Sequence, residues 1–268
     1  MARSKSPLSI TGSIKDLSFY EVEGEDGIFV RQKGGANRNH IRNSPVFDKL
    51  RKAENELRGR SIVAKGVRKA FDLWAYGIFN RHLQAAVAGV LAQIQNMESN
   101  ITTGKRGVYI TKYKEVLNQV KWYYYKPMKE ILLCPYSIET SEDRKSITIT
   151  FKGLNPKFHI KAPAAASHFK LFLGIGTVTD SVVYPNSLRW TKPHGQNVDA
   201  IARAESEWIA LNGPLMDDLT LTATLREGFV IKDDKTVLRA LGIVFGKMMY
   251  QIEMIPRDRG SIEYLGGV

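Results

Sequence analysis

The apolar residues of this chain change their spacing near residue 122, and this change most constrains the fold. Between Phe71 and Ile94 apolar residues recur in steps of three, one and four, which is typical of an amphipathic helix. Beyond residue 122, apolar and polar residues alternate in short runs bounded by Gly, Pro, Asn or Asp. Alternation of this kind indicates β-strands with one buried face.

The two patterns together predict an α+β protein. We expect an N-terminal β-hairpin arm with a basic linker (1–43), a helical middle (44–120) with one long amphipathic helix, and a C-terminal antiparallel immunoglobulin-like β-sandwich (121–268). The long helix is expected from about Ile62 to just before Asn100, and a shorter helix from Thr111 or Lys112 to Val120. Alternating runs at 146–151, 169–175, 219–225 and 250–254 follow one another without helical segments, which favours a sandwich.

The N-terminal arm is predicted from two β-prone runs, Leu17–Val22 and Ile28–Lys33, separated by the turn-forming residues 23–27. Two strands alone are marginally stable in water. Their apolar side chains therefore need a covering surface, which is either the body of the same chain or a neighbouring subunit. The residues expected to make this assembly contact are Leu17, Phe19, Tyr20, Ile28, Phe29 and Val30.

Residues 34–43 lack periodicity and contain two glycines and three asparagines, so we expect a basic linker there. The following Ser44 and Pro45 are a typical helix start, because the serine hydroxyl caps free amides and proline suits the first helical position.

The positive charge is concentrated in one segment. Residues 31–69 hold twelve Lys and Arg against three Asp and Glu, which is +9 of the net charge of +12. Such asymmetry favours an anionic partner, either nucleic acid bound through its phosphates or an acidic protein surface. The alternative is an ordinary solvated helix face, in which Glu54 and Glu56 dilute the charge. The candidate contact residues are Arg31, Lys33, Arg38, Arg42, Lys49, Arg51, Lys52, Arg58, Arg60, Lys65, Arg68 and Lys69.

Catalytic and cofactor motifs are not found in the sequence. The five histidines form no HExxH or His/Cys cluster. Gly174-Ile175-Gly176 lacks the third glycine of a dinucleotide fingerprint, so we interpret it as a strand-end bulge or turn. The segment 242–247 is one residue short of a P-loop and is followed by Met248 instead of a hydroxyl residue. We therefore predict no enzyme, catalytic residue, metal site, cofactor or small-molecule substrate, although a site assembled from distant residues stays open.

The single cysteine, Cys134, excludes an internal disulfide and fits a reducing compartment, where we expect it to be a small buried hydrophobic residue. The N-terminus has the positive charge of a signal peptide but no apolar segment follows. The stretch 71–94 is too polar to cross a membrane. These features predict a cytoplasmic protein with no membrane partner.

The first seventy or so residues resemble an uncharacterised family of basic proteins from Bacteroidota. The shared pattern is Ile10-x-Gly12-x-Ile14-x-x-Leu17-Ser18-Phe19-Tyr20, then Val30-Arg31-x-Lys33-Gly34-Gly35 and Ser44-Pro45-x-Phe47 with Arg51 following. The resemblance implies no activity, but it favours hairpin, linker and first helix as one module. The chain has Lys15-Asp16 where the family often has Gly-Asn, which argues against a tight turn there.

The sequence therefore suggests two functions. The first is a non-enzymatic structural subunit, a homo-oligomer that assembles into a particle, tube or filament through the arm and the sandwich edges. The second is an architectural protein that binds nucleic acid independently of sequence through residues 31–69.

Overall fold

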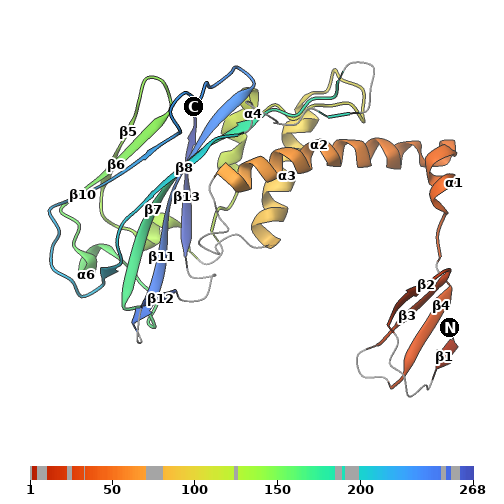
Figure 1. The fold of residues 1–268 in the computed structure, drawn as a ribbon, viewed down its shortest axis with the longest axis horizontal. Coiled ribbons are helices and arrows are strands. Elements are labelled where there is room, and N and C mark those ends of the chain that lie inside the picture. Colours follow the sequence, from red (N-terminus) through yellow and green to blue (C-terminus); the bar gives the residue numbers. More distant parts are fainter. Residues whose placement is uncertain are drawn as a thin grey trace. The chain divides into compact units, whose positions relative to one another are not determined.

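The computed structural model describes residues 2–4, 11–22, 26–32, 34–70, 81–123, 126–184, 189–190, 199–248, 252–254 and 260–268. The chain divides into two compact units, which we call the N-terminal unit (1–51) and the C-terminal unit (52–268). Figure 1 shows the elements of both. The chain is α+β with antiparallel sheets, as predicted. Among the described helices, none is both long and apolar enough to cross a membrane.

The N-terminal unit contains a four-stranded antiparallel sheet, which we call the arm sheet. Its order is β1 (Ala2–Ser4), β4 (Ile28–Gln32), β3 (Leu17–Tyr20) and β2 (Gly12–Ile14). The predicted hairpin is confirmed as β3 and β4, in which Phe19 pairs with Val30. Between β2 and β3 the chain turns at Lys15 and Asp16, although these residues stand where the family often has Gly-Asn, and Lys15 takes a positive φ of 49°.

The predicted linker is wrong for residues 38–43, which form the helix α1 (Arg38–Asn43). Its first turn is capped by the Asn37 side chain, which accepts a hydrogen bond of 2.8 Å from the His40 amide. This cap satisfies an amide that the start of a helix otherwise leaves free. The predicted helix start at Ser44 and Pro45 is found as a short 3-10 helix η1 (Pro45–Phe47), followed directly by α2 (Asp48–Ala70), but the Ser44 side chain makes no capping hydrogen bond.

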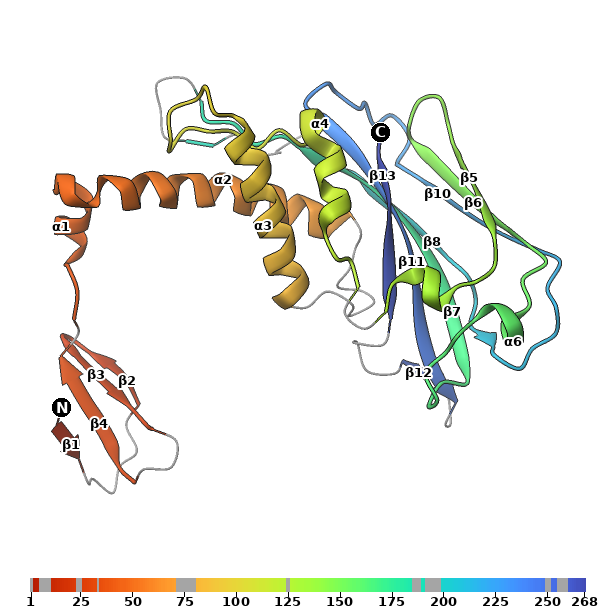
Figure 2. The same ribbon diagram turned by 180° about the vertical axis from the view of Figure 1, so that it is seen from behind.

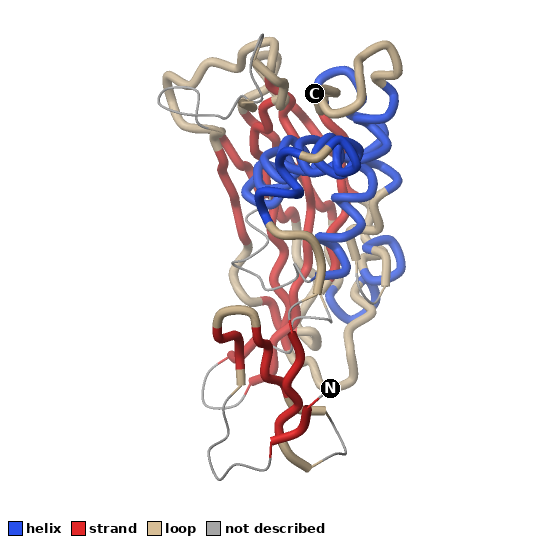
Figure 3. The backbone as a smooth tube through the Cα atoms, turned by 90° about the vertical axis from the view of Figure 1, so that its right-hand side faces the viewer, coloured by secondary structure: helices blue, strands red, loops and turns tan. Residues whose placement is uncertain are grey.

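The C-terminal unit consists of two sheets and a layer of helices (Figure 1), and Figure 3 shows helices in front of the strands. A central sheet contains the two long strands β7 (His168–Thr179) and β11 (Lys235–Met248), flanked on one side by β8 (Ile201–Glu205) and β9 (Ile209–Ala210), and on the other by β12 (Ile252–Met254) and β13 (Ser261–Gly267). A second sheet has the order β10 (Asp218–Thr224), β6 (Ser146–Lys152) and β5 (Tyr136–Thr140). The shorter helices of the unit are α4 (Ile110–Tyr113), η2 (Lys114–Gln119), α5 (Met128–Ile131) and α6 (Pro156–His159).

The two long strands of the central sheet, β7 and β11, are buried on both faces along most of their length. On β7, Phe169, Leu171 and Leu173 belong to the core shared with the second sheet, whereas Phe172 and Val178 belong to the core shared with the helices. Successive side chains of a strand point to opposite faces, so both cores are filled from the same strand. The predicted strands at 146–151, 169–175 and 219–225 are confirmed as β6, β7 and β10; of the run at 250–254, residues 252–254 form β12 and the first two lie outside the described residues.

The prediction of one continuous helix from Ile62 to about Asn100 is wrong. The chain forms α2 and a second helix, α3 (Arg81–Met97), and residues 71–80 lie outside the described part. Gln95 of α3 donates a hydrogen bond of 3.4 Å to the backbone oxygen of Glu56 in α2, although 39 residues separate them. A continuous helix would place these residues about 58 Å apart. Figure 2 shows α3 beside α2. The shorter predicted helix is found as α4 and η2.

Glycines allow α2 to lie close to the central sheet. A Cβ atom on Gly176 would lie 2.4 Å from the Cα of Ala70, and one on Gly66 would lie 3.1 Å from Val178. Gly174-Ile175-Gly176 therefore lies within a strand instead of at a strand-end bulge or turn, and close packing accounts for Gly176 without a bound phosphate. The segment 242–247 likewise lies within β11.

Candidate interaction surfaces

The apolar face of the arm sheet is the first candidate surface. The strand register places Ile14, Leu17, Phe19 and Val30 on one face. Ile14 is 53% exposed and Leu17 is 42% exposed, while Phe19 and Val30 are half-buried. The predicted arm residues on this face are therefore brought together, but they are only partly covered by their own chain.

The opposite face of the arm sheet carries aromatic side chains. Tyr20 and Phe29 are cross-strand neighbours whose rings stack at 5.9 Å. The guanidinium of Arg31 lies 5.2 Å from the centre of the Tyr20 ring, a cation–π arrangement. Both rings are half-buried, so this face is also incompletely covered.

The described part of the N-terminal unit has almost no core of its own. Of its side chains whose burial is described, only Ile28 is buried. Neither α1 nor η1 contributes a buried residue, and Val46 in η1 is 82% exposed. Because the described part of this unit buries so little apolar area, it lacks the main driving force for stable folding.

The predicted basic contact residues differ in their surroundings. Arg51 donates hydrogen bonds of 2.7 and 2.8 Å to the backbone oxygens of Ile41 and Ser44, so it stabilises the α1–η1 turn. Lys52 lies against Gly104. Exposed members of the set are Arg31, Arg38, Arg42, Lys49, Arg58, Lys65 and Lys69; half-buried members are Arg51, Lys52, Arg60 and Arg68. Lys33 lies outside the described residues.

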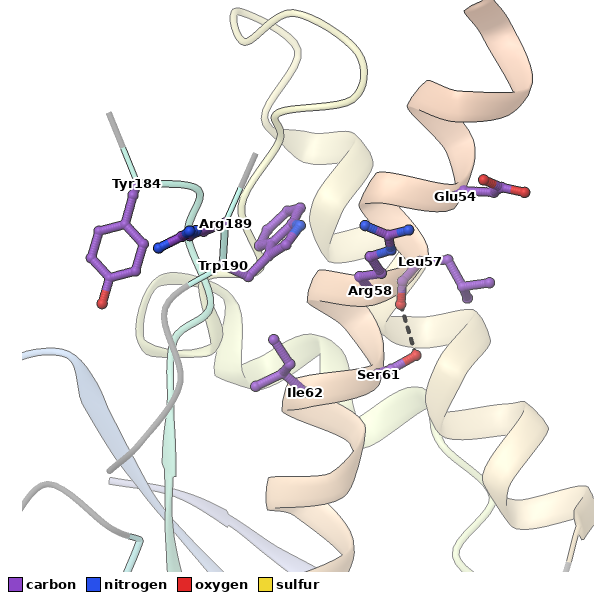
Figure 4. A pocket seen from close by; sticks show the side chains of 8 residues that line it. All are labelled: Glu54, Leu57, Arg58, Ser61, Ile62, Tyr184, Arg189 and Trp190. Carbon is purple, nitrogen blue, oxygen red and sulfur yellow. Dashed lines mark hydrogen bonds between the residues drawn. The ribbon is translucent and has the colours of Figure 1, made fainter. Parts of the chain in front are cut away.

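The second candidate surface is a groove beside α2, with a volume of about 850 Å³, which we call the α2 groove (Figure 4). It is lined by Glu54, Leu57, Arg58, Ser61, Ile62, Tyr184, Arg189 and Trp190. Leu57 is 52% exposed and Tyr184 is 45% exposed. The hydroxyl of Ser61 donates to the backbone oxygen of Leu57 at 2.8 Å. The groove thus combines apolar side chains with two arginines and one carboxylate.

Trp190 holds the two walls of the groove together. A Cβ atom on Gly59 would lie 2.4 Å from the Trp190 ring, so only glycine lets the indole pack flat against α2. The indole nitrogen donates a hydrogen bond of 3.1 Å to Asn55, which itself donates one of 2.6 Å to the oxygen of Gly104. Trp190 is buried against α2.

A buried ionic network fixes α2 from its inner side. The Glu56 carboxylate accepts three hydrogen bonds of 2.7 Å, two from the Arg106 guanidinium and one from the Gly104 amide. Burial alone would raise the pKa of Glu56, but these hydrogen bonds and the charge of Arg106 outweigh it and hold the pKa below its ordinary value. Glu56 was expected only to dilute the basic segment, whereas it anchors the helix.

A second buried charge cluster joins the central sheet to α2. The Lys235 ammonium, which is almost fully buried, donates to Asp199 at 3.0 Å and to Thr179 at 2.6 Å. Asp199 also lies next to Gly66 of α2. Since the lysine and the aspartate neutralise each other, this cluster is explained by its structural contacts. Within the described ranges, no three His, Cys, Asp or Glu side chains converge to hold a metal ion.

Comparisons with protein-family models, with curated proteins and with solved structures found no match to this chain. The candidate surfaces therefore rest on geometry and sequence. The basic residues of α2 were found from the charge distribution, but Tyr184 and Arg189 of the groove were not. They carry no local signal, because only the tertiary fold brings them to α2.

Proposed function

We propose that this protein is a non-enzymatic structural subunit that assembles with copies of itself through its N-terminal arm and the edges of its sheets. The observation that carries the proposal is the lack of a core in the N-terminal unit, where Ile28 is the one buried side chain among those described. A neighbouring copy that covers Ile14, Leu17 and Phe19 would supply the missing burial.

The edges of the arm sheet offer a second means of association. β2 lies at one edge and β1 at the other, and an edge strand has backbone groups that an added strand can pair with. Main-chain pairing at β2 would place a new strand next to Ile14, so that the apolar face and the edge contact the same neighbour.

We also propose that the sandwich of the C-terminal unit is immunoglobulin-like. Its strand order supports this, since β5, β6 and β10 share one sheet while β8, β7, β11 and β13 share the other. In chain order this corresponds to strands A, B and E facing C′, C, F and G of such a sandwich. The helices cover the outer face of the second group, which leaves sheet edges as the assembly contacts of this unit.

The test is light scattering coupled to size-exclusion chromatography of the full chain over a range of concentrations. The variant Ile14→Lys introduces a charge on the apolar face of the arm sheet, and Ser13→Lys is its matched control, because Ser13 is also exposed but lies on the opposite face. Burying an isoleucine contributes about 1.5–3 kcal/mol. Ile14→Lys should therefore weaken assembly at least about tenfold, and Ser13→Lys should leave it unchanged. A wild-type chain that stays monomeric at every concentration would refute the proposal.

Nucleic-acid binding is the second candidate function. It is favoured by Arg58, Lys65 and Lys69, which are exposed and lie seven and four residues apart on the same side of α2. Phosphate binding by such a row predicts affinity for unrelated duplexes that falls steeply with salt. Reversing the three charges should abolish that binding, and duplex binding that survives the reversal would contradict this assignment.

A further inference from the structure

We infer that the α2 groove receives the acidic segment of the arm from a second copy of this chain. The inference rests on the proposed function and names the contact through which copies join head to tail. We define the acidic segment as residues 16–30, which hold five Asp and Glu and no Lys or Arg.

The groove requires an occupant with both apolar and acidic groups. Leu57 and Tyr184 are about half exposed there, and Figure 4 shows Ile62 on the side of α2 that faces Tyr184. Arg58 and Arg189 supply two positive charges and Glu54 one negative charge. A volume of about 850 Å³ is within the range of ligand-sized clefts, about 300–1,000 Å³.

The acidic segment has this chemistry. Residues 21–26 contain four acidic residues, and Val22, an exposed apolar residue, lies among them. Glu21 and Asp26 are exposed. Val22 would contact the apolar part of the groove lining, while the carboxylates would pair with the two arginines.

The charge distribution of the whole chain supports the same occupant. Residues 16–30 carry −5 and the adjoining residues 31–69 carry +9. Opposite charges on two surfaces of one chain favour association of unlike surfaces on different copies, and they disfavour association of like surfaces. A head-to-tail contact of this kind repeats, so that each added copy presents a new groove or a new arm.

Complementation between two variants tests the inference. Arg58→Glu with Arg189→Glu damages only the groove, and Glu21→Arg with Asp26→Arg damages only the arm. Each double variant alone should be monomeric in light scattering. An equimolar mixture should form a dimer and nothing larger, since one intact groove meets one intact arm. Lys65→Glu with Lys69→Glu, on the same side of α2 but outside the groove, is the matched control and should assemble like the wild type.

Each other outcome identifies what failed. If the groove variant assembles like the wild type, the inference is wrong while the proposed function stands. If the wild type is monomeric, the proposed function itself fails. A mixture that stays monomeric, with each variant folded by circular dichroism, means that the arm does not reach the groove of another copy. A groove variant that loses only duplex binding assigns the groove to nucleic acid instead. Leu57→Ser changes an exposed side chain of the groove without changing the charge, and it should weaken assembly as well. This variant tests the groove even if the replacement of Arg189 disturbs the fold.

Discussion

Replacing Glu56 should destabilise the C-terminal unit far more than its position in a basic segment suggests. The carboxylate is 7% exposed and the Arg106 side chain is 18% exposed. Removing it in Glu56→Ala leaves the guanidinium and the Gly104 amide without their partner inside the protein. Glu56→Gln keeps the shape and one acceptor oxygen but loses the charge.

The expected loss in the free energy of unfolding follows from the three hydrogen bonds of 2.7 Å that the Glu56 carboxylate accepts. Hydrogen bonds to charged groups contribute about 1.5–3 kcal/mol each in net stability, but they are not additive, and breaking a buried ion pair costs about 3–5 kcal/mol in total. Because Arg106 is partly accessible to water, we expect the lower end of this range. Glu56→Ala should reduce the free energy of unfolding by about 3 kcal/mol and Glu56→Gln by about 2 kcal/mol.

The assay is equilibrium unfolding in guanidinium at pH 7, followed by circular dichroism. Glu54→Gln is the matched control, since Glu54 is exposed on the same helix and its replacement should change the free energy by less than about 0.5 kcal/mol. A double-mutant cycle with Arg106→Met isolates the pair. Equal stabilities of Glu56→Gln and Glu54→Gln would refute the reasoning.

The same pair predicts a pH dependence. The pKa of Glu56 in the folded state lies below its ordinary value of 4.5, so the unfolded chain binds the proton first as the pH falls. Its contribution to stability is therefore complete above about pH 4.5 and is lost as the pH falls through the folded pKa. The stability difference between the wild type and Glu56→Gln should shrink in that acidic range, and a difference that grows there would contradict the assigned ion pair.

Two further predictions concern packing and burial. Gly176→Ala should destabilise the C-terminal unit by about 1–3 kcal/mol, because the added Cβ would collide with Ala70. Gly89→Ala, on the open face of α3, should instead stabilise the unit by about 0.5–1 kcal/mol. Chemical unfolding measures both effects, and equal effects would exclude the close approach of α2 to the sheet. Cys134 is buried, and its burial raises the pKa of the thiol. Ellman's reagent at pH 8 should therefore react with the native protein at least about a hundredfold more slowly than with the unfolded chain. Comparable rates would show that the thiol is exposed.

The half-buried elements could be predicted from the sequence. β6 and β10 alternate between buried apolar residues and outward-facing Ser or Thr, so their period of two is visible. The arm hairpin was predicted from two β-prone runs and the turn-forming residues between them. β11 was missed although it is the longest strand, since residues 240–246 are all buried. A strand buried on both faces has no polar face, and its alternation disappears.

The helices could be predicted less well, because the buried face of α2 contains few large apolar residues. The apolar residues assigned to one helix fall in α3 and in residues 71–80, outside the described part, while the buried face of α2 is formed by Asn55, Glu56, Gly59, Val63 and other small or polar residues. A hydrophobic pattern does not reveal such a face. The groove was beyond prediction for a related reason, because Tyr184 and Arg189 are distant from α2 in the sequence and lie beside it only in the folded chain, where Trp190 packs on Gly59.

By itself the sequence determined the local features of this protein: an α+β class, the positions of the alternating strands, and a chain in which an acidic arm precedes a basic helix. These depend on residue type and spacing, which act over a few neighbouring positions. Only the tertiary structure decided which charged side chains form hydrogen bonds within the protein, as Glu56 and Arg51 do. It also decided which apolar residues stay exposed, as Leu17 and Leu57 do. Those outcomes depend on which distant segment covers each side chain, and no local pattern records that.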